Sequence, residues 1–200
     1  SVLKKLESVG VPVISVTGNL DYTKWEDAID YKKPKWTWAR QDFFSKIVKK
    51  YKNIKIFDYS FAKFGDIVFI GMATSTFPGR VKSKNYKKMR VRLDKLFKRF
   101  KDKKIIFVSH NVPYKTKLSK IGGYAPSGLR GAEKGSKLVR RITERYKPIL
   151  NIAGHMHENQ GKVKIGKTLV VNPGAATDGK CAIIDFDVEK GRVKNVEFVK

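Results

Sequence analysis

Three histidines are the residues of this chain best suited to chemistry, and each follows a short apolar run typical of a strand. His110 comes after residues 105–109, while His155 and His157 come after residues 148–153 with one residue between them. Neutral imidazole is the commonest metal ligand, and α/β sheets place ligands just past the carboxyl ends of their strands. The pattern indicates a metal site at one rim of a sheet. The alternative is that all three are ordinary hydrogen-bonded loop residues.

A fourth candidate ligand, Asn19, follows the β-branched run of residues 11–17 and a break at Gly18. An amide oxygen beside imidazole nitrogens makes a mixed site, which suits manganese, iron, zinc or nickel better than calcium or copper(I). On a turn past a strand end, the imidazoles of His155 and His157 can diverge to reach two ions about 3.5–4 Å apart.

The elements that must position these residues alternate between strands and helices. Apolar and β-branched runs predict strands over residues 11–17, 54–57, 59–64, 66–71, 104–109, 148–153, 162–165, 167–171, 181–188 and 192–199. Helical periodicity predicts helices over residues 1–9, 38–51, 84–101 and 135–146. We expect an α/β fold with helices outside a sheet-rich core and the polar strand ends at one rim. Residues 54–57 and 59–64 are expected to pair with each other.

Composition restricts the class of protein. The 200 residues are 41% hydrophobic and 31% charged, which is typical of one globular domain and not of a disordered segment. No apolar run approaches the roughly 18 residues of a membrane span, and no signal peptide is visible, so we expect a cytoplasmic protein without a membrane partner. The single cysteine, Cys181, excludes a disulfide framework, and its strand-like surroundings predict a buried, inert thiol.

The formal net charge of +26 is extreme. A basic surface attracts polyanions, which makes nucleic acid a candidate partner. The excess is mostly lysine and is spread along the chain, a habit that also fits a thermophile. Both explanations stay open, and the charge itself favours an anionic substrate.

Residues 161–168 match the phosphate-binding pattern G-x-x-x-x-G-K-[ST] letter for letter. That motif needs a strand before the loop and a helix after it. Here Val163 and Ile165 alternate with lysines, and the apolar run after Thr168 leads into Asn-Pro-Gly. The stretch therefore predicts a hairpin that turns at Gly166, not a nucleotide site.

Three blocks in this order resemble the calcineurin-like metallophosphoesterases: Gly18-Asn19-Leu20-Asp21, Ser109-His110-Asn111-Val112-Pro113 and Gly154-His155-Met156-His157, with a closing Asn172-Pro173-Gly174 turn. The resemblance extends over nearly the whole chain. It implies one domain over residues 1–200, folded as a four-layer α/β/β/α sandwich of two mixed sheets flanked by helices. The activity it implies is hydrolysis of a phosphoester substrate by a metal-activated hydroxide at a two-metal centre.

The same resemblance assigns the ligands. Asn19, His110 and His155 would hold one divalent ion and His157 the other, with manganese favoured over iron, nickel or zinc. Asp21 is a candidate for orienting a ligand, or equally for capping a turn. Asn111 and Asp21 together are the remaining candidates for contact with a ligand or substrate.

The chain departs from the family pattern in two places. Leu20 stands where the family usually has a histidine thought to protonate the leaving oxygen, and its absence favours phosphodiesters. The chain also opens at Ser1 in a helix, without the Asp-x-His and Gly-Asp-x-x-Asp blocks that supply further ligands. We therefore expect an N-terminally incomplete domain without its first two strands, in which activity of the 200-residue chain is an open question.

A second class of function also stays open. On the same fold, the basic surface could serve a non-catalytic binding or scaffold protein that holds nucleic acid or a partner protein. Turnover of a phosphodiester with added Mn²⁺ separates the two classes.

Overall fold

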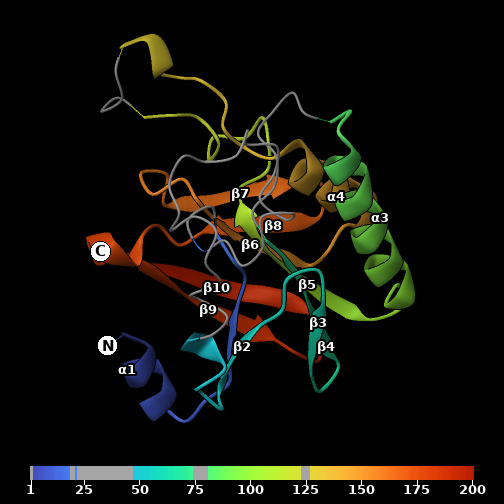
Figure 1. Ribbon diagram of the computed structural model, residues 1–200, viewed down its shortest axis with the longest axis vertical. Coiled ribbons are helices and arrows are strands. Elements are labelled where there is room, and N and C mark those ends of the chain that lie inside the picture. Colours follow the sequence, from blue (N-terminus) through green and yellow to red (C-terminus); the bar gives the residue numbers. More distant parts are fainter. Residues whose placement is uncertain (1, 19–20, 22–46, 74–80, 123–126) are drawn as a thin grey trace.

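The computed structural model describes residues 2–18, 21, 47–73, 81–122 and 127–200 (Figure 1). Its centre is a six-stranded mixed sheet in the order β3-β4-β5-β6-β8-β7. The strands are β3 (Phe61–Phe64), β4 (Ile67–Met72), β5 (Lys104–Asn111), β6 (Leu150–Gly154), β8 (Thr168–Asn172) and β7 (Gly161–Ile165). The four inner strands run parallel, and β3 and β7 are antiparallel to their neighbours. The carboxyl ends of β5 and β6 therefore lie side by side at one rim.

Two helices cover one face of this sheet. Apolar side chains recur every three or four residues along α3 (Lys84–Arg99) and α4 (Lys137–Tyr146), and these are the buried ones. The Ser83 and Ser136 hydroxyls accept the backbone N–H of Tyr86 and Val139, which caps the two helix starts. The helices and sheet share a core that includes Ile70, Leu93, Phe97, Phe107, Leu138 and Ile142.

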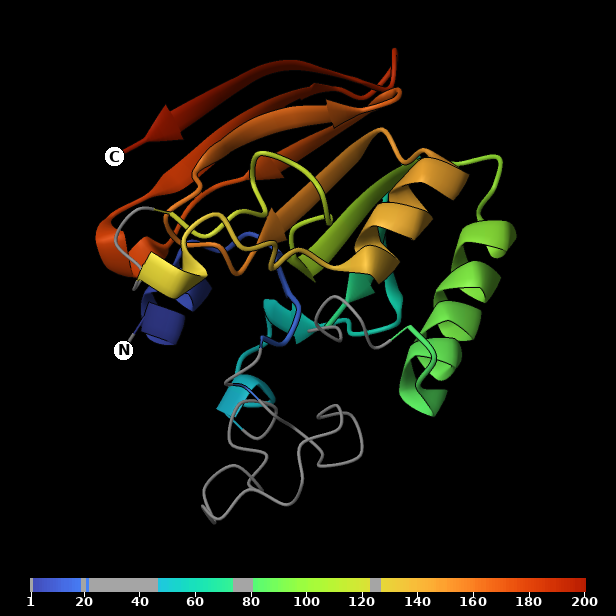
Figure 2. The same cartoon turned by 90° about the horizontal axis from the view of Figure 1, so that it is seen from above.

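An antiparallel ribbon packs on the opposite face. It consists of β9 (Cys181–Asp187) and β10 (Arg192–Val199), and Figure 2 shows it across the sheet from α3 and α4. Alternate side chains of β9 contact the apolar face of the sheet: Ala182, Ile184 and Phe186. A separate parallel pair, β1 (Val13–Ser15) and β2 (Ile54–Ile56), follows the short helix α1 (Val2–Ser8).

The structure confirms the predicted α/β class with helices outside a mixed sheet. Residues 161–168 form the β7–β8 hairpin, with Gly166 in the left-handed region at φ 57°, so the phosphate-binding match is only a match of letters. No helix among the described residues is long and apolar enough to cross a membrane. Of the helix predicted over residues 38–51, all but the last turn lies outside the described residues.

Two local predictions are wrong. Residues 54–56 pair in parallel with β1 and not with residues 61–64, because the chain bends at Asp58 and Tyr59, where Tyr59 has φ 49°. Cys181 is exposed and not buried. Side chains of a strand alternate between faces, and Ala182 takes the core-facing position beside it.

Candidate metal centre

His110 and His155 meet at the rim formed by β5 and β6. The Nε2 atom of His110 lies 3.1 Å from the Nδ1 atom of His155, and the two ring planes are inclined by 68°. Ser109 pairs with Ala153 while Asn111 pairs with Gly154, so His110 is the extra residue of a β-bulge. A bulge re-aims the side chain that it inserts, and here His110 turns toward the residue that follows β6.

Buried polar side chains hold the bulge in place. The Ser109 hydroxyl donates to the Asn111 carbonyl at 3.0 Å. The Asn151 amide donates to the Ser109 hydroxyl at 3.0 Å and to the Phe107 carbonyl at 3.1 Å. Ser109, Asn111 and Asn151 are all buried. Sequence reasoning missed the roles of Ser109 and Asn151, although an asparagine inside the apolar run of 148–153 was a signal for them.

The turn that carries His155 and His157 rests on Asn172. The Asn172 amide donates to the carbonyls of Met156 at 2.7 Å and Asn159 at 2.9 Å. Met156 is buried and anchors the turn in the apolar cluster beneath it. His155 has the left-handed φ of 72°, which is uncommon for a residue other than glycine, while His157 is exposed. The closing Asn-Pro-Gly turn therefore supports the histidine turn from β8.

The segment before Asn19 packs against His110. A Cβ atom added at Gly18 would lie 2.9 Å from Cε1 of the His110 ring, so only glycine fits without displacement. The Gly18 N–H donates to the Asp21 carboxylate at 3.1 Å, which gives Asp21 the turn-capping contact. Asn19 and Leu20 themselves lie outside the described residues.

The surroundings keep both imidazoles neutral. Burial, followed by the nearby His155 and His157 rings, lowers the pKa of His110 to about 4. Burial also lowers the pKa of His155; His157 and Lys134 lower it further, and Glu158 opposes them. A neutral imidazole keeps the lone pair that a metal ion requires.

The described residues fit part of a metal centre. Two nitrogens that each bind one ion at about 2.0–2.1 Å stand roughly 3 Å apart, which is the spacing of the His110 and His155 nitrogens. The structure thus brings together His110 and His155, with His157 near enough to affect their pKa values. Within the described part of the chain, no three His, Cys, Asp or Glu side chains gather closely enough to hold an ion.

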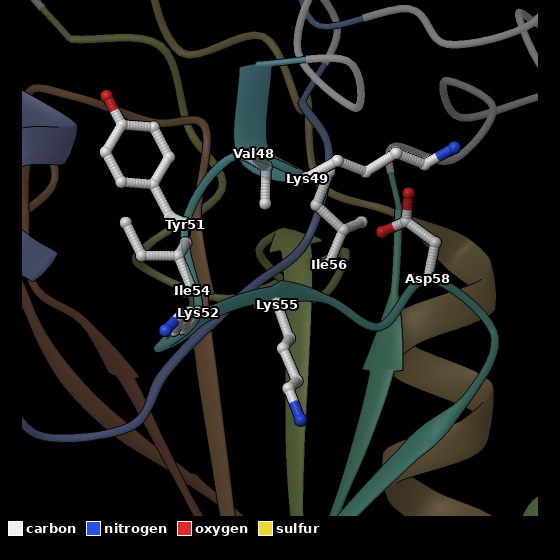
Figure 3. Close-up of a pocket in the computed structure, with 8 residues that line it drawn as sticks. All are labelled: Val48, Lys49, Tyr51, Lys52, Ile54, Lys55, Ile56 and Asp58. Atoms are coloured by element: carbon white, nitrogen blue, oxygen red, sulfur yellow. The ribbon is translucent and has the colours of Figure 1, made fainter.

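A pocket of about 540 Å³ lies along β2, and its lining residues all come from the segment 48–58 (Figure 3). Lysines and apolar side chains line most of it, with Asp58 at one end. The Asp58 carboxylate accepts the backbone N–H of Thr17 at 2.9 Å and the Thr17 hydroxyl at 2.6 Å. This clamp joins β2 to the segment that reaches His110 through Gly18.

The sequence matches the model of one family, described as metallophosphoesterase, calcineurin superfamily, over residues 1–196. The chain belongs to this family. Metallophosphoesterases of this superfamily generally hydrolyse phosphoesters and usually bind divalent metal ions. The resemblance drawn from the three histidine- and asparagine-bearing blocks is thereby confirmed.

Two solved structures share the fold of this chain. One crystal structure has a TM-score of 0.63 and 18% identity, covering 98% of this chain and 69% of the other. The crystal structure of TT1561 of Thermus thermophilus has a TM-score of 0.61 and 17% identity, covering 98% of this chain and 75% of its own. Purple acid phosphatase PPD1 from yellow lupin (Lupinus luteus) seeds is less similar, with a TM-score of 0.37 and 17% identity, and the match covers 70% of this chain and 24% of the phosphatase. No curated protein matches the sequence significantly.

We predict that the metal-free protein loses stability as the pH falls from about 6.5 to about 4. Over this range His110 binds a proton in the unfolded chain but stays neutral in the folded protein, because its pKa in the folded protein lies below the usual 6.5. Above pH 6.5 both states are neutral and the effect vanishes. Thermal melting in chelator across this range should show a falling Tm, and His110→Gln should flatten the curve. If Tm fell equally with pH in the unchanged protein and in His110→Gln, His110 would not be the group whose lowered pKa causes the loss of stability.

Proposed function

We propose that this protein hydrolyses phosphodiesters at a two-metal centre that includes the histidine pair. The observation that supports the proposal most is the 3.1 Å approach of the two imidazoles at the bulged rim of the sheet. Their lowered pKa values keep them available as ligands at neutral pH. Membership of the metallophosphoesterase family supports the same class of chemistry.

The ligand assignment follows from where the side chains lie. His110 and His155 would hold one divalent ion together, since they are the pair in contact. His157, exposed two residues further on, would reach a second ion, and Asn19 would complete the first. The favoured ion is manganese, with iron, nickel and zinc as alternatives. Such ions neutralise charge on phosphoryl oxygens and make water a better nucleophile.

The residues of the chain itself position this chemistry. The Ser109, Asn111 and Asn151 contacts hold the backbone of the bulge that carries His110, and Asn172 holds the turn that carries His155. Residues that orient metal ligands commonly affect metal affinity about 10- to 100-fold. Leu20 offers no proton to a leaving group, so a substrate with a stable leaving group is favoured. This supports a diester over a monoester.

Hydrolysis of two aryl phosphates tests the proposal. With Mn²⁺ added after chelation, we expect kcat/KM for bis(4-nitrophenyl) phosphate to exceed that for 4-nitrophenyl phosphate about tenfold or more, one factor of ten being about 1.4 kcal/mol in the barrier. A preference for the monoester would contradict the diester assignment. Absence of turnover with any of the four metals would favour the binding or scaffold function instead.

A further inference from the structure

Helix α3 carries a row of five exposed cations, which we call the α3 stripe: Lys84, Lys88, Arg92, Lys95 and Arg99. Successive members are three or four residues apart, so they are neighbours on one face of the helix. At 3.6 residues and 5.4 Å per turn, they lie within about 80° of arc along about 22 Å of helix. The five side chains are exposed, and Figure 1 shows α3 at the edge of the molecule, so the stripe is a linear array of positive charge open to solvent.

The charge of α3 exceeds what the composition alone supplies. Eight of its 16 residues are lysine or arginine, which is half, whereas 44 of the 200 residues in the chain are basic, which is about a fifth. Strand β9 has two aspartates and no basic residue in its seven positions. Positive charge is therefore concentrated on α3, although the whole chain is basic.

The single acidic residue of α3, Asp94, does not neutralise the stripe. The Asp94 carboxylate accepts the hydroxyl of Tyr146 at 2.7 Å and lies 4.0 Å from the Arg145 guanidinium, both on α4. Among the residues that the structure describes, no ion pair involves a member of the stripe. Like charges three or four residues apart repel one another. The row therefore opposes helix formation, and an external polyanion would relieve that repulsion.

Aromatic rings hold two of the arginines. The Arg92 guanidinium lies 5.8 Å from the ring centroid of Tyr59. The Arg99 guanidinium lies 4.9 Å from the ring centroid of Phe61 and 5.2 Å from that of Phe100. Stacking on a ring leaves the N–H groups of a guanidinium free to reach phosphate oxygens. Part of the stripe is thus oriented before any ligand arrives.

We propose that the α3 stripe binds the phosphate backbone of a nucleic acid strand. A row of cations complements a linear polyanion, and binding to the backbone needs no particular base sequence. Four large side chains of α3 are already buried against the sheet, Tyr86, Met89, Leu93 and Phe97, and Val91 is the single large apolar side chain that the helix exposes. The helix therefore has no apolar face to insert into a bilayer, as an interfacial helix does. This favours nucleic acid over a membrane surface.

The position of α3 connects the stripe with the candidate metal centre. The helix joins the parallel neighbours β4 and β5, so it must run back along the sheet from the rim where β4 ends. Lys84 therefore lies toward the rim that carries His110, and Arg99 lies toward the opposite rim. A strand bound along the stripe would extend toward the histidine pair. The binding itself does not rest on the proposed hydrolysis.

Fluorescence anisotropy with a labelled oligothymidylate, in chelator to prevent hydrolysis, tests the proposal. The test variant is Lys88→Gln with Arg92→Gln and Lys95→Gln. We expect its Kd to rise at least about tenfold at constant salt. If each lost phosphate contact contributes about 0.7 to the slope of log K against log salt for a single strand, the slope should fall by about 2.

The matched control removes the same number of charges elsewhere: Lys162→Gln with Lys164→Gln and Lys167→Gln, all exposed on the β7–β8 hairpin. Its Kd should change less than about threefold, since those lysines make no phosphate contact in this arrangement. Equal losses in the two variants would show a net-charge effect and overturn the proposal. Absence of oligothymidylate binding would also overturn it. The same holds if the stripe variant loses affinity only for equimolar phosphatidylserine–phosphatidylcholine vesicles and not for the oligonucleotide. Unchanged thermal melting of both variants guards against misfolding.

Discussion

Replacing His155 by asparagine should lower Mn²⁺-dependent phosphodiesterase activity by at least about 100-fold. Changing a residue that only orients a ligand costs up to about that factor, and here the ligand imidazole itself is replaced by an amide too short to reach the same position. Asparagine is the natural choice at this position, since His155 has φ 72° and asparagine tolerates the left-handed region better than other non-glycine residues. The free energy of unfolding should therefore stay close to that of the unchanged protein. A loss of activity without a loss of stability would identify His155 as a ligand.

The control for this experiment is Lys147→Asn. Lys147 caps the end of α4 with φ 49°, so it has the same kind of backbone conformation as His155. It lies before β6, whereas His155 lies after β6. Its activity should match that of the unchanged protein. Steady-state kinetics against metal concentration measure the effect. A His155→Asn variant that keeps its activity at saturating Mn²⁺ would remove His155 from the metal centre.

Replacing Gly71 by alanine should destabilise the fold by about 2–4 kcal/mol, the range of severe overpacking. An added Cβ atom would lie 2.3 Å from the Phe57 carbonyl oxygen and 2.7 Å from Cδ2 of its ring. Neither group can move freely, because the chain here is tied on both sides of the bend. The Gly71 N–H donates to the Ser60 carbonyl, and the Tyr59 N–H donates to the Gly71 carbonyl, each at 3.0 Å.

Urea unfolding measures this second effect, with the shift of the midpoint at unchanged slope as the readout. Gly128→Ala is the matched control: no heavy atom lies within 4 Å of its added Cβ, and its φ is not left-handed. Its midpoint should stay within the error of the measurement. If Gly71→Ala were equally neutral, the close approach of Phe57 to β4 would be wrong. The same bend carries Asp58 and its clamp on Thr17, so we expect metal affinity to weaken as well.

Much of the fold was predictable because its signals are local. Apolar and helical patterns predicted β10 over its full length and α3 to within two residues, and the boundary errors for the other described elements are at most two residues. Turn chemistry at Gly166 was enough to distinguish a hairpin from a phosphate-binding loop. The family resemblance implied that His110 and His155 share one ion, and the structure places a ring nitrogen of each 3.1 Å apart, while their role as ligands stays a prediction.

The partners of strands and the aim of side chains were decided by packing between distant parts of the chain. The pairing of β2 with β1 depends on the bend at Asp58 and Tyr59, and local propensity does not specify which of two strands a third will join. Asn19 lies outside the described residues. The roles of His110, His155 and His157 as metal ligands, and of Asn111 as a contact to a ligand or substrate, stay predictions.

The sequence by itself determined which residues reach the rim of the sheet and which family the chain belongs to. Only the tertiary structure decided that His110 turns toward His155, because a bulge exists only relative to a neighbouring strand. It also decided that Asn151 and Asn172 support the two histidines, and that the thiol of Cys181 faces solvent. Those outcomes depend on which surfaces bury one another, and burial is settled only when the whole chain packs together.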